Sequence, residues 1–311
     1  MSYPIEDKIV IAIASSALFD LSESDSVFKA EGEAAYRAWM YSRRDEPLDP
    51  GMAYPFIRRF LTLNRGYPAG EGPAEVVLLS KNDPEAGLRV FRSIKELGLD
   101  IIRAAFLDGR SPYAYLPAFN ASLFLSADPR DVEAAIAAGS PAGRVLSPGP
   151  DADSATDSED DELRIAFDFD GVVADDEAER VYRSAGGLAA FSESEVSKAA
   201  LPLDPGPLKD FFVKLAALQR HDEAIRSPDA APRVRTALVT ARNAPAHERV
   251  VTSLASWGLR ADETFFLGGI EKRRILEVFK PHLFFDDQMS HLAAAWGSAV
   301  CVHVPFGIAN R

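Results

Sequence analysis

The chain has little of the chemistry that disulfides, membrane spans and nucleic-acid binding require. Cys301 is the single cysteine among 311 residues, which excludes an intramolecular disulfide and is typical of a reducing compartment. Lys and Arg number 34 against 47 Asp and Glu, and the net charge of −13 argues against sequence-independent binding to nucleic acid or to an anionic membrane. No apolar run approaches the roughly 20 residues that a membrane span needs. We therefore expect a cytoplasmic protein that binds neither nucleic acid nor membranes.

What remains is the composition of a globular protein with room for two domains. Hydrophobic residues make up 47% of the chain, enough for two separate cores at this length. The first residues have a short apolar run between acidic flanks, which favours a first core strand over a signal peptide. Residues 147–162 contain seven acidic and no large apolar residues, which predicts a solvated linker between two domains. A long acidic loop within one domain is the alternative.

Strand-like and helix-like segments alternate in both halves. In the second half, residues 163–311, apolar runs predict strands at 164–168, 235–239, 263–267, 282–286 and 299–304, with helices at 176–186, 245–257, 271–279 and 289–296. This alternation predicts a parallel, doubly wound sheet with Rossmann-like topology. Residues 187–233 exceed an ordinary connection and include a helical run at 207–220, so we expect a small cap insertion there.

The two halves also resemble each other in register, which predicts an internal duplication. Residues 13–32 match 167–186 at a constant offset, and glycines and apolar strands stay in register over most of the remainder. Residues 76–83 fall on 237–244 with Asn82 against Asn243, and one residue of slippage follows. We therefore expect tandem α/β domains at 1–146 and 163–311.

The strongest local signal is a pair of aspartates at the end of the strand predicted at 164–168. Asp168 and Asp170 are spaced i, i+2 and followed by Gly171, which permits a sharp turn or a close backbone approach. The carboxyl end of such a strand is where open α/β sheets bind ligands. Two carboxylates held this close are costly unless a cation neutralises them, which predicts a metal or phosphate site.

Three further motifs follow in order at later strand ends: Thr240-Ala241-Arg242, Lys272, and Asp286-Asp287. Together with the first pair they resemble the motifs of the haloacid-dehalogenase-like phosphatases, which are an aspartate pair, a Thr or Ser, a Lys and a late acidic pair. The resemblance implies a phosphatase fold for the second half.

The chemistry of these residues assigns each a role. Asp168 is the candidate nucleophile that forms an aspartyl-phosphate, and Asp170 is the candidate general acid and base. Thr240, Ala241, Arg242 and Lys272 are the candidate phosphate-binding residues, although Arg242 could equally be a solvated side chain. Carboxylates around a phosphate favour Mg²⁺. Its candidate ligands are Asp168, Asp286, Asp287 (directly or through water) and, by the family resemblance, the backbone carbonyl of Asp170.

Several longer runs resemble the cytosolic 5′-nucleotidase I family, which dephosphorylates nucleoside monophosphates, notably AMP. The resembling runs are 15–21, 79–84, 87–91, 111–116, 121–126, 166–172 and 281–288. They lie in both halves and include the aspartate motifs. The resemblance implies a Mg²⁺-dependent 5′-nucleotidase; a phosphatase of sugar phosphates or other small metabolites and a nucleotide-sensing protein are the alternatives.

The catalytic residues have no equivalents in the first half. In the alignment Asp168 faces Ala14, Asp170 faces Ser16, Lys272 faces Pro112, and the late acidic pair faces Ser126-Ala127. We therefore expect residues 1–146 to form a degenerate, non-catalytic copy. Two roles are open for it, completing the nucleotide pocket or forming the surface of a homodimer.

Overall fold

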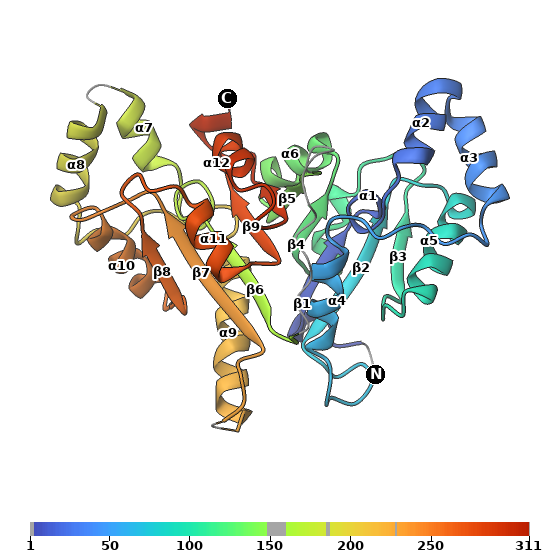
Figure 1. Cartoon of the computed structure of the whole chain (residues 1–311), viewed down its shortest axis with the longest axis horizontal. Coiled ribbons are helices and arrows are strands. Elements are labelled where there is room, and N and C mark those ends of the chain that lie inside the picture. Colours follow the sequence, from blue (N-terminus) through green and yellow to red (C-terminus); the bar gives the residue numbers. More distant parts are fainter. Residues whose placement is uncertain (1–2, 148–159, 185–186, 228, 311) are drawn as a thin grey trace. The chain divides into compact units, whose positions relative to one another are not determined.

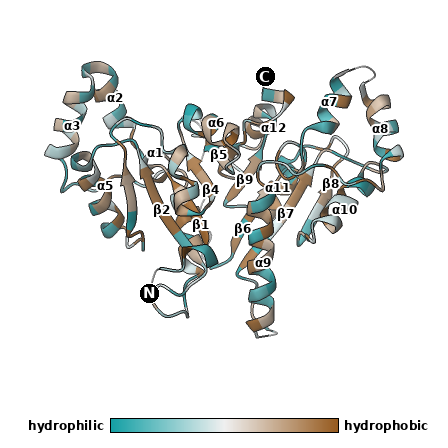
Figure 2. Cartoon of the chain, turned by 180° about the vertical axis from the view of Figure 1, so that it is seen from behind, coloured by the Kyte–Doolittle hydropathy of each residue, from teal (hydrophilic) through white to brown (hydrophobic). Residues whose placement is uncertain are grey.

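The structure, a computed structural model, describes residues 3–147, 160–184, 187–227 and 229–310. The chain divides into two compact units, Met1–Ser140 and Pro141–Arg311. Each is a mixed α/β unit with helices around a largely parallel sheet (Figure 1). In both, the strands carry the most hydrophobic residues, and polar residues gather on the helices and loops (Figure 2). In the part of the chain that the structure describes, no helix combines the length and the apolar character required to cross a membrane.

The first unit contains four parallel strands in the order β3-β2-β1-β4. Their bounds are β1 Ile9–Ile13, β2 Ala74–Ser80, β3 Arg103–Phe106 and β4 Ala121–Ser126. Every residue of β1 is buried, as predicted for a first core strand. The helices are α1 Ser15–Leu18, α2 Ser22–Glu31, α3 Glu33–Ser42, α4 Tyr54–Thr62, α5 Pro84–Glu96 and α6 Pro129–Ala137, with 3₁₀ turns at Ile5–Asp7, Tyr113–Tyr115 and Pro117–Phe119.

The second unit contains the strand order β8-β7-β6-β9-β10-β5. Its strands are β5 Ala142–Val145, β6 Leu163–Phe167, β7 Val234–Thr240, β8 Glu263–Phe266, β9 Leu283–Asp286 and β10 Cys301–His303. The helices are α7 Glu177–Ser184, α8 Gly187–Ser197, α9 Lys209–Ile225, α10 His247–Ser256, α11 Arg273–Phe279 and α12 Met289–Ala294, followed by a 3₁₀ turn at Ile308–Asn310. The five predicted strands are all present, and β6, β7, β8, β9 and β10 pair in parallel.

The boundary between the units falls before the one predicted at residue 146. The reason is β5, which pairs antiparallel with β10 and so belongs to the second unit. The acidic segment 147–162 therefore connects two strands of the same unit, β5 and β6, instead of two separate units. Residues 148–159 of that segment lie outside the described residues.

The region predicted as a cap insertion, residues 187–233, divides between two different layers. Helix α8 packs with α7, and the two stand together as a helical pair (Figure 1). Helix α9 instead packs on the sheet, since the rings of Phe211 and Phe212 lie 6.1 and 5.1 Å from that of Phe167 on β6. The cap prediction is therefore wrong for α9, whose aromatic face belongs to the core.

The two units have the same central strand order, and several hydrogen bonds within the first unit have counterparts within the second. The hydroxyl of Ser80 accepts from the backbone N–H of Asn82 (3.1 Å), and that of Thr240 accepts from the N–H of Arg242 (3.2 Å). Ser80 therefore corresponds to Thr240 and Asn82 to Arg242, so the predicted pairing of Asn82 with Asn243 is wrong by one residue.

Arginines and serines that lie 160 residues apart also make matching bonds. The guanidinium of Arg89 donates to the carbonyl of Glu46 (2.8 Å), and that of Arg249 donates to the carbonyl of Leu201 (2.9 Å). The hydroxyl of Ser93 donates to the backbone carbonyl of Arg89, and that of Ser253 donates to the backbone carbonyl of Arg249.

Candidate active site

The aspartate motif begins where β6 leaves the buried sheet. Asp168 is 4% exposed, and its N–H donates to the carbonyl of Phe285 on β9 (2.8 Å), which holds the strand end in the sheet. Gly171 adopts a left-handed φ of +73°, and a Cβ there would lie 2.6 Å from Cγ of Asp287. Glycine therefore allows the loop after Asp168 to lie directly against the late acidic pair.

Lys272 joins the carboxylates of two different strands. It lies immediately before α11 and is 6% exposed. Its ammonium lies 2.8 Å from a carboxylate oxygen of Asp168 and 2.7 Å from one of Asp286. Although burial works against a charged lysine, the two carboxylates raise the pKa of Lys272 above its usual value. The centre is thus a buried Asp–Lys–Asp cluster with one cation for two nearby carboxylates.

The remaining negative charge in this cluster is not balanced by described protein groups. Burial, and then the Asp286 and Asp170 carboxylates, raise the pKa of Asp168 to about 7 against the effect of Lys272. Burial and the charges of Asp168 and Asp286 raise the pKa of Asp287 to about 9. Oδ1 of Asp287 is buried and has no hydrogen-bond partner among the described residues. Buried carboxylates in this condition call for an additional cation.

The donor set around this position fits a hard divalent cation. Asp168, Asp286 and His291 offer one ligand atom each, and these three atoms lie within 4.8 Å of one another. His291 lies on α12, with Nδ1 3.2 Å from both carboxylate oxygens of Asp286. Burial works against ionisation of Asp286, but Lys272 and His291 lower its pKa. Carboxylate oxygens with an orphan oxygen at Asp287 suit Mg²⁺, which binds oxygen ligands.

His291 is the residue at this site that the sequence prediction missed. The histidines show no metal-ligand spacing along the chain, and His291 reaches the cluster only because α12 starts directly after β9. The available signal was its position five residues after Asp286.

Asp170 is held by a different cation. Arg242 makes a two-pronged contact with both of its carboxylate oxygens, each at 2.8 Å. Arg242 is only 4% exposed, so its interpretation as a solvated side chain is wrong. Burial opposes its charge, but Asp170 and Glu195 raise its pKa.

Glu195 links this contact to the helical pair α7–α8. The Glu195 side chain, 1% exposed, bonds Arg242 and also accepts from Arg249 (3.0 Å). Arg249 in turn donates to Glu177 on α7 (2.8 Å). A continuous chain of charged side chains therefore runs from Asp170 to both helices of the pair, and it is buried at Arg242, Glu195 and Arg249.

Thr240 and Ala241 form the end of β7 beside this cluster. The Thr240 hydroxyl is 1% exposed and accepts from the N–H of Arg242, which leaves its own proton free to donate. Ala241 is exposed at the strand end. Helix α10 follows without a side-chain cap at its N-terminus, so its first N–H groups have no side-chain acceptor at the cap position.

The structure brings the predicted residues into two linked groups. Asp168, Lys272 and Asp286 form one, with Asp287 against Gly171, and Asp170 with Arg242 forms the other. Thr240 connects to the second through Arg242. The nearby Lys280 lies after α11 in a left-handed conformation, and its carbonyl accepts from Arg164.

The fold and this site together define an α/β protein with a carboxylate and lysine centre at the carboxyl ends of the parallel strands of its second unit. The chain belongs to the 5′-nucleotidase family, whose model matches residues 1–311. This confirms the resemblance expected from the sequence.

Among curated proteins the chain is similar to human cytosolic 5′-nucleotidase 1B, with 34% identity over 297 residues. The match covers 93% of this chain and 47% of the human protein, so the chain spans about half the length of that relative. No solved structure gives a significant match.

Proposed function

We propose that this protein is a cytoplasmic 5′-nucleotidase that hydrolyses nucleoside 5′-monophosphates such as AMP to nucleoside and phosphate. The observation that carries the proposal is the buried Asp168–Lys272–Asp286 cluster at the carboxyl edge of a parallel sheet. Membership of the 5′-nucleotidase family and the similarity to a human cytosolic 5′-nucleotidase support the substrate class.

In this proposal Asp168 is the nucleophile. Its Oδ2 contacts Lys272, and its Oδ1 accepts from the N–H of Phe169 (2.7 Å), so both oxygens are oriented before substrate arrives. Attack on phosphorus forms an aspartyl-phosphate and releases the nucleoside oxygen; water then hydrolyses the intermediate. Lys272 stays beside the reacting carboxylate and stabilises the charge that develops on the phosphoryl oxygens.

Asp170 is the proposed acid and base. It protonates the leaving 5′-oxygen and then takes a proton from the attacking water. Arg242 donates to both of its oxygens and so orients the carboxylate, which keeps its remaining lone pairs for the leaving oxygen and the attacking water. We infer that the incoming phosphoryl group accepts from Arg242 and from the Thr240 hydroxyl, and that the N–H at Ala241 completes the phosphate contacts.

Mg²⁺ is the proposed cofactor, held by carboxylates of Asp168, Asp286 and Asp287 and by the backbone at Asp170. When bound, it would supply positive charge that offsets the crowded carboxylates and the phosphate.

The first unit is proposed to be a degenerate copy that arose with the second by duplication. The shared strand order supports a common origin. So do the matching hydrogen bonds, since Ser80 and Thr240 each accept from a nearby backbone N–H, and Arg89 and Arg249 each donate to a backbone carbonyl. In the position of Asp168 this unit has Ala14, which lacks a nucleophile.

The test is release of phosphate from a panel of nucleoside monophosphates and sugar phosphates with Mg²⁺ present. We expect nucleoside monophosphates to be the best substrates. Asp168→Asn should abolish turnover, whereas the matched control Asp210→Asn, at a side chain 79% exposed, should retain it. Equal turnover by Asp168→Asn would refute the mechanism, and a preference for sugar phosphates would refute the substrate class.

A further inference from the structure

The first unit contains a cavity of about 750 Å³ in the position where the second unit has its catalytic cluster. It is lined by residues that follow the carboxyl ends of β1, β2, β3 and β4, and by side chains from α2 and α3. Ser16, Asn82 and Ala127 line it, at the positions that correspond to Asp170, Arg242 and Asp287. A cavity of this size at the switch point of a parallel sheet has the place and volume of a small-molecule site.

This cavity is not arranged for a phosphate group. Two helices begin at it, and each is capped by its own aspartate: Asp83 accepts from the first N–H groups of α5 (2.7 and 3.0 Å), and Asp128 accepts from that of α6 (2.9 Å). In the second unit, the corresponding helices α10 and α12 have no side-chain cap. The aspartates therefore occupy the positions at which helix N-termini bind anions.

Two of the cations that line the cavity are also engaged in ion pairs. Lys81 lies 2.7 Å from Asp128 and 2.9 Å from Asp131, and Arg37 lies 2.6 Å from Asp108 and 3.3 Å from Asp83. Six acidic and four basic side chains line the cavity in all, so its lining has a net charge of −2. An anionic ligand would have to displace these ion pairs against that charge.

What the cavity does offer is an aromatic surface and neutral hydrogen-bonding groups. The rings of Phe28 and Tyr36 pack edge to face with centroids 6.0 Å apart, and Phe28 is 50% exposed. The hydroxyl of Tyr36 donates to Oδ1 of Asn82 (2.9 Å). Nδ2 of Asn82 is buried and, within the described part of the chain, has no hydrogen-bond partner. This leaves an unused donor next to Tyr36, whose ring packs against the exposed ring of Phe28.

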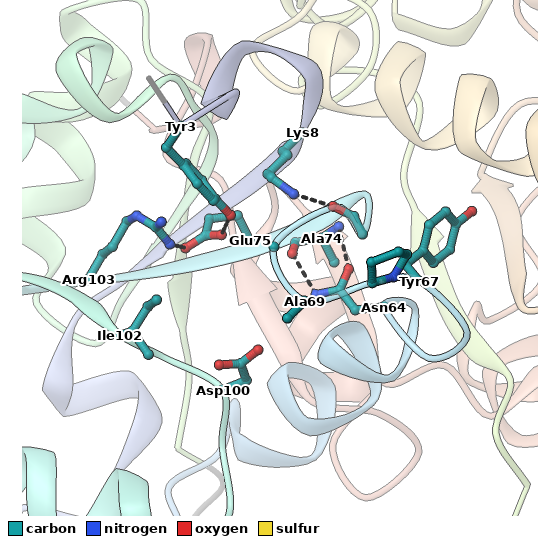
Figure 3. A pocket seen from close by; sticks show the side chains of 13 residues that line it. Tyr3, Lys8, Asn64, Tyr67, Ala69, Ala74, Glu75, Asp100, Ile102 and Arg103 are labelled. Atoms are coloured by element: carbon teal, nitrogen blue, oxygen red, sulfur yellow. Dashed lines mark hydrogen bonds and ion pairs between the residues drawn. The ribbon is translucent and has the colours of Figure 1, made fainter. Parts of the chain in front are cut away.

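A second cavity, about 270 Å³, shows the contrast (Figure 3). It lies near the start of β2, where Glu75 bonds Tyr3 and Arg103 (2.6 Å), and Asn64 exchanges two bonds with the backbone of Ala74. Glu75 and Asn64 are thus already engaged within the protein, as expected of a structural cavity.

We propose that the cavity of the first unit binds an uncharged nucleoside. The base would stack on the Phe28–Tyr36 surface and accept from Asn82, and the ribose hydroxyls would donate to the carboxylates that line the cavity. This ligand is the product of the proposed hydrolysis, and only its identification as a product rests on that function. The chain then carries one site that takes the phosphorylated form and one that selects its dephosphorylated form.

Calorimetric titration of the full-length Asp168→Asn variant with adenosine, guanosine and inorganic phosphate tests this proposal. A nucleoside should bind, and phosphate should not compete for it. Introduced into this variant, Tyr36→Ala should weaken nucleoside binding about tenfold because stacking is lost. Asn82→Leu should weaken it by about as much because a buried donor is lost. Tyr36→Phe, which keeps the ring, should bind more tightly than Tyr36→Ala. The midpoint of thermal unfolding identifies any variant that fails to fold, and the binding data of the folded variants decide the result.

The matched control is Tyr41→Ala, which removes a 46% exposed ring from the same helix, α3, without touching the cavity. It should leave nucleoside binding unchanged. The proposal is overturned if no nucleoside binds, if phosphate competes, or if folded Tyr36→Ala and Asn82→Leu variants bind as tightly as the control. Calorimetry needs no turnover, so a chain that binds nucleoside but releases no phosphate would refute only the proposed hydrolysis.

Discussion

The charge chain that joins Asp170 to the helical pair makes a sharp prediction for Glu195→Gln. The Glu195 carboxylate is 1% exposed and serves two arginines, Arg242 and Arg249, that are themselves 4% and 3% exposed. The substitution keeps the shape of the side chain but removes one of the negative charges that balance them. The new side-chain amide also places an NH₂ donor against a guanidinium. A guanidinium has only donors itself, so the two groups cannot bond.

The expected cost follows from that burial. Removing one partner of a buried ion pair costs about 3–5 kcal/mol, and because glutamine keeps one acceptor we expect about 3 kcal/mol. For a unit of this size, that loss lowers the midpoint of thermal unfolding by about 6–12 °C. Hydrolysis should also fall, because Arg242 loses one of the contacts that hold it against Asp170.

The assay is thermal unfolding at neutral pH beside Glu193→Gln, the same substitution at an exposed position two residues away on α8. The control should shift the midpoint by no more than about 1–2 °C, as an exposed substitution usually costs within about 0.5 kcal/mol. If the two variants unfold at the same temperature, the buried charge chain does not stabilise this unit and the reasoning fails.

Three further predictions concern the centre and its surroundings. Gly171→Ala should cost about 2 kcal/mol or more in urea unfolding, because it combines a left-handed φ with a Cβ 2.6 Å from an aspartate carbon; Gly297→Ala, where φ is +82° and no atom lies within 4 Å, should cost less. Burial would raise the pKa of Glu177, but bonds from two cations lower it to about 2, so its stabilisation is present above pH 4.5 and lost as the pH falls toward 2. The difference in thermal midpoint between the native chain and Glu177→Gln should therefore shrink below pH 4.5; a constant difference contradicts this. Lys272→Met should lower kcat/KM for phosphate release by about 10³-fold, whereas Lys280→Met at an exposed helix end should not, and equal losses would contradict the assignment.

Local sequence pattern was sufficient for the strands of the sheet and for the first motif. The buried strand Ile9–Ile13 is an unbroken apolar run, and Leu163–Phe167 is apolar apart from Arg164. The loop after Leu163–Phe167 contains Gly171, whose left-handed φ and close contact with Asp287 favour glycine. The order of strand ends along the sequence then placed Asp168, Lys272 and Asp286 together, because parallel strands bring their carboxyl ends to one edge.

The features that were missed depend on contacts between distant segments. The short strand β5 has only four residues, one of which is glycine. It is defined by its pairing with β10 and not by its own sequence pattern. Helix α9 lies in a long insertion, and only its ring contacts with Phe167 assign it to the sheet. The contact of Glu195 with Arg242 joins residues 47 positions apart, which no spacing rule could indicate.

The crowding of carboxylates in the second unit links its folding to what it binds. Burial and neighbouring charge raise the pKa of Asp168 to about 7 and that of Asp287 to about 9, so this unit takes up protons when it folds at neutral pH. The sign follows: the stability that these two groups contribute is present below the ordinary aspartate range and is lost as the pH rises through 7 and then 9. A divalent cation that binds only the folded unit would replace those protons and raise its unfolding temperature in proportion to the logarithm of its concentration. The first unit has alanine in both of these positions, Ala14 and Ala127, and so is free of that dependence. Of the two units, only the second therefore has crowded carboxylates whose charge a divalent cation would offset.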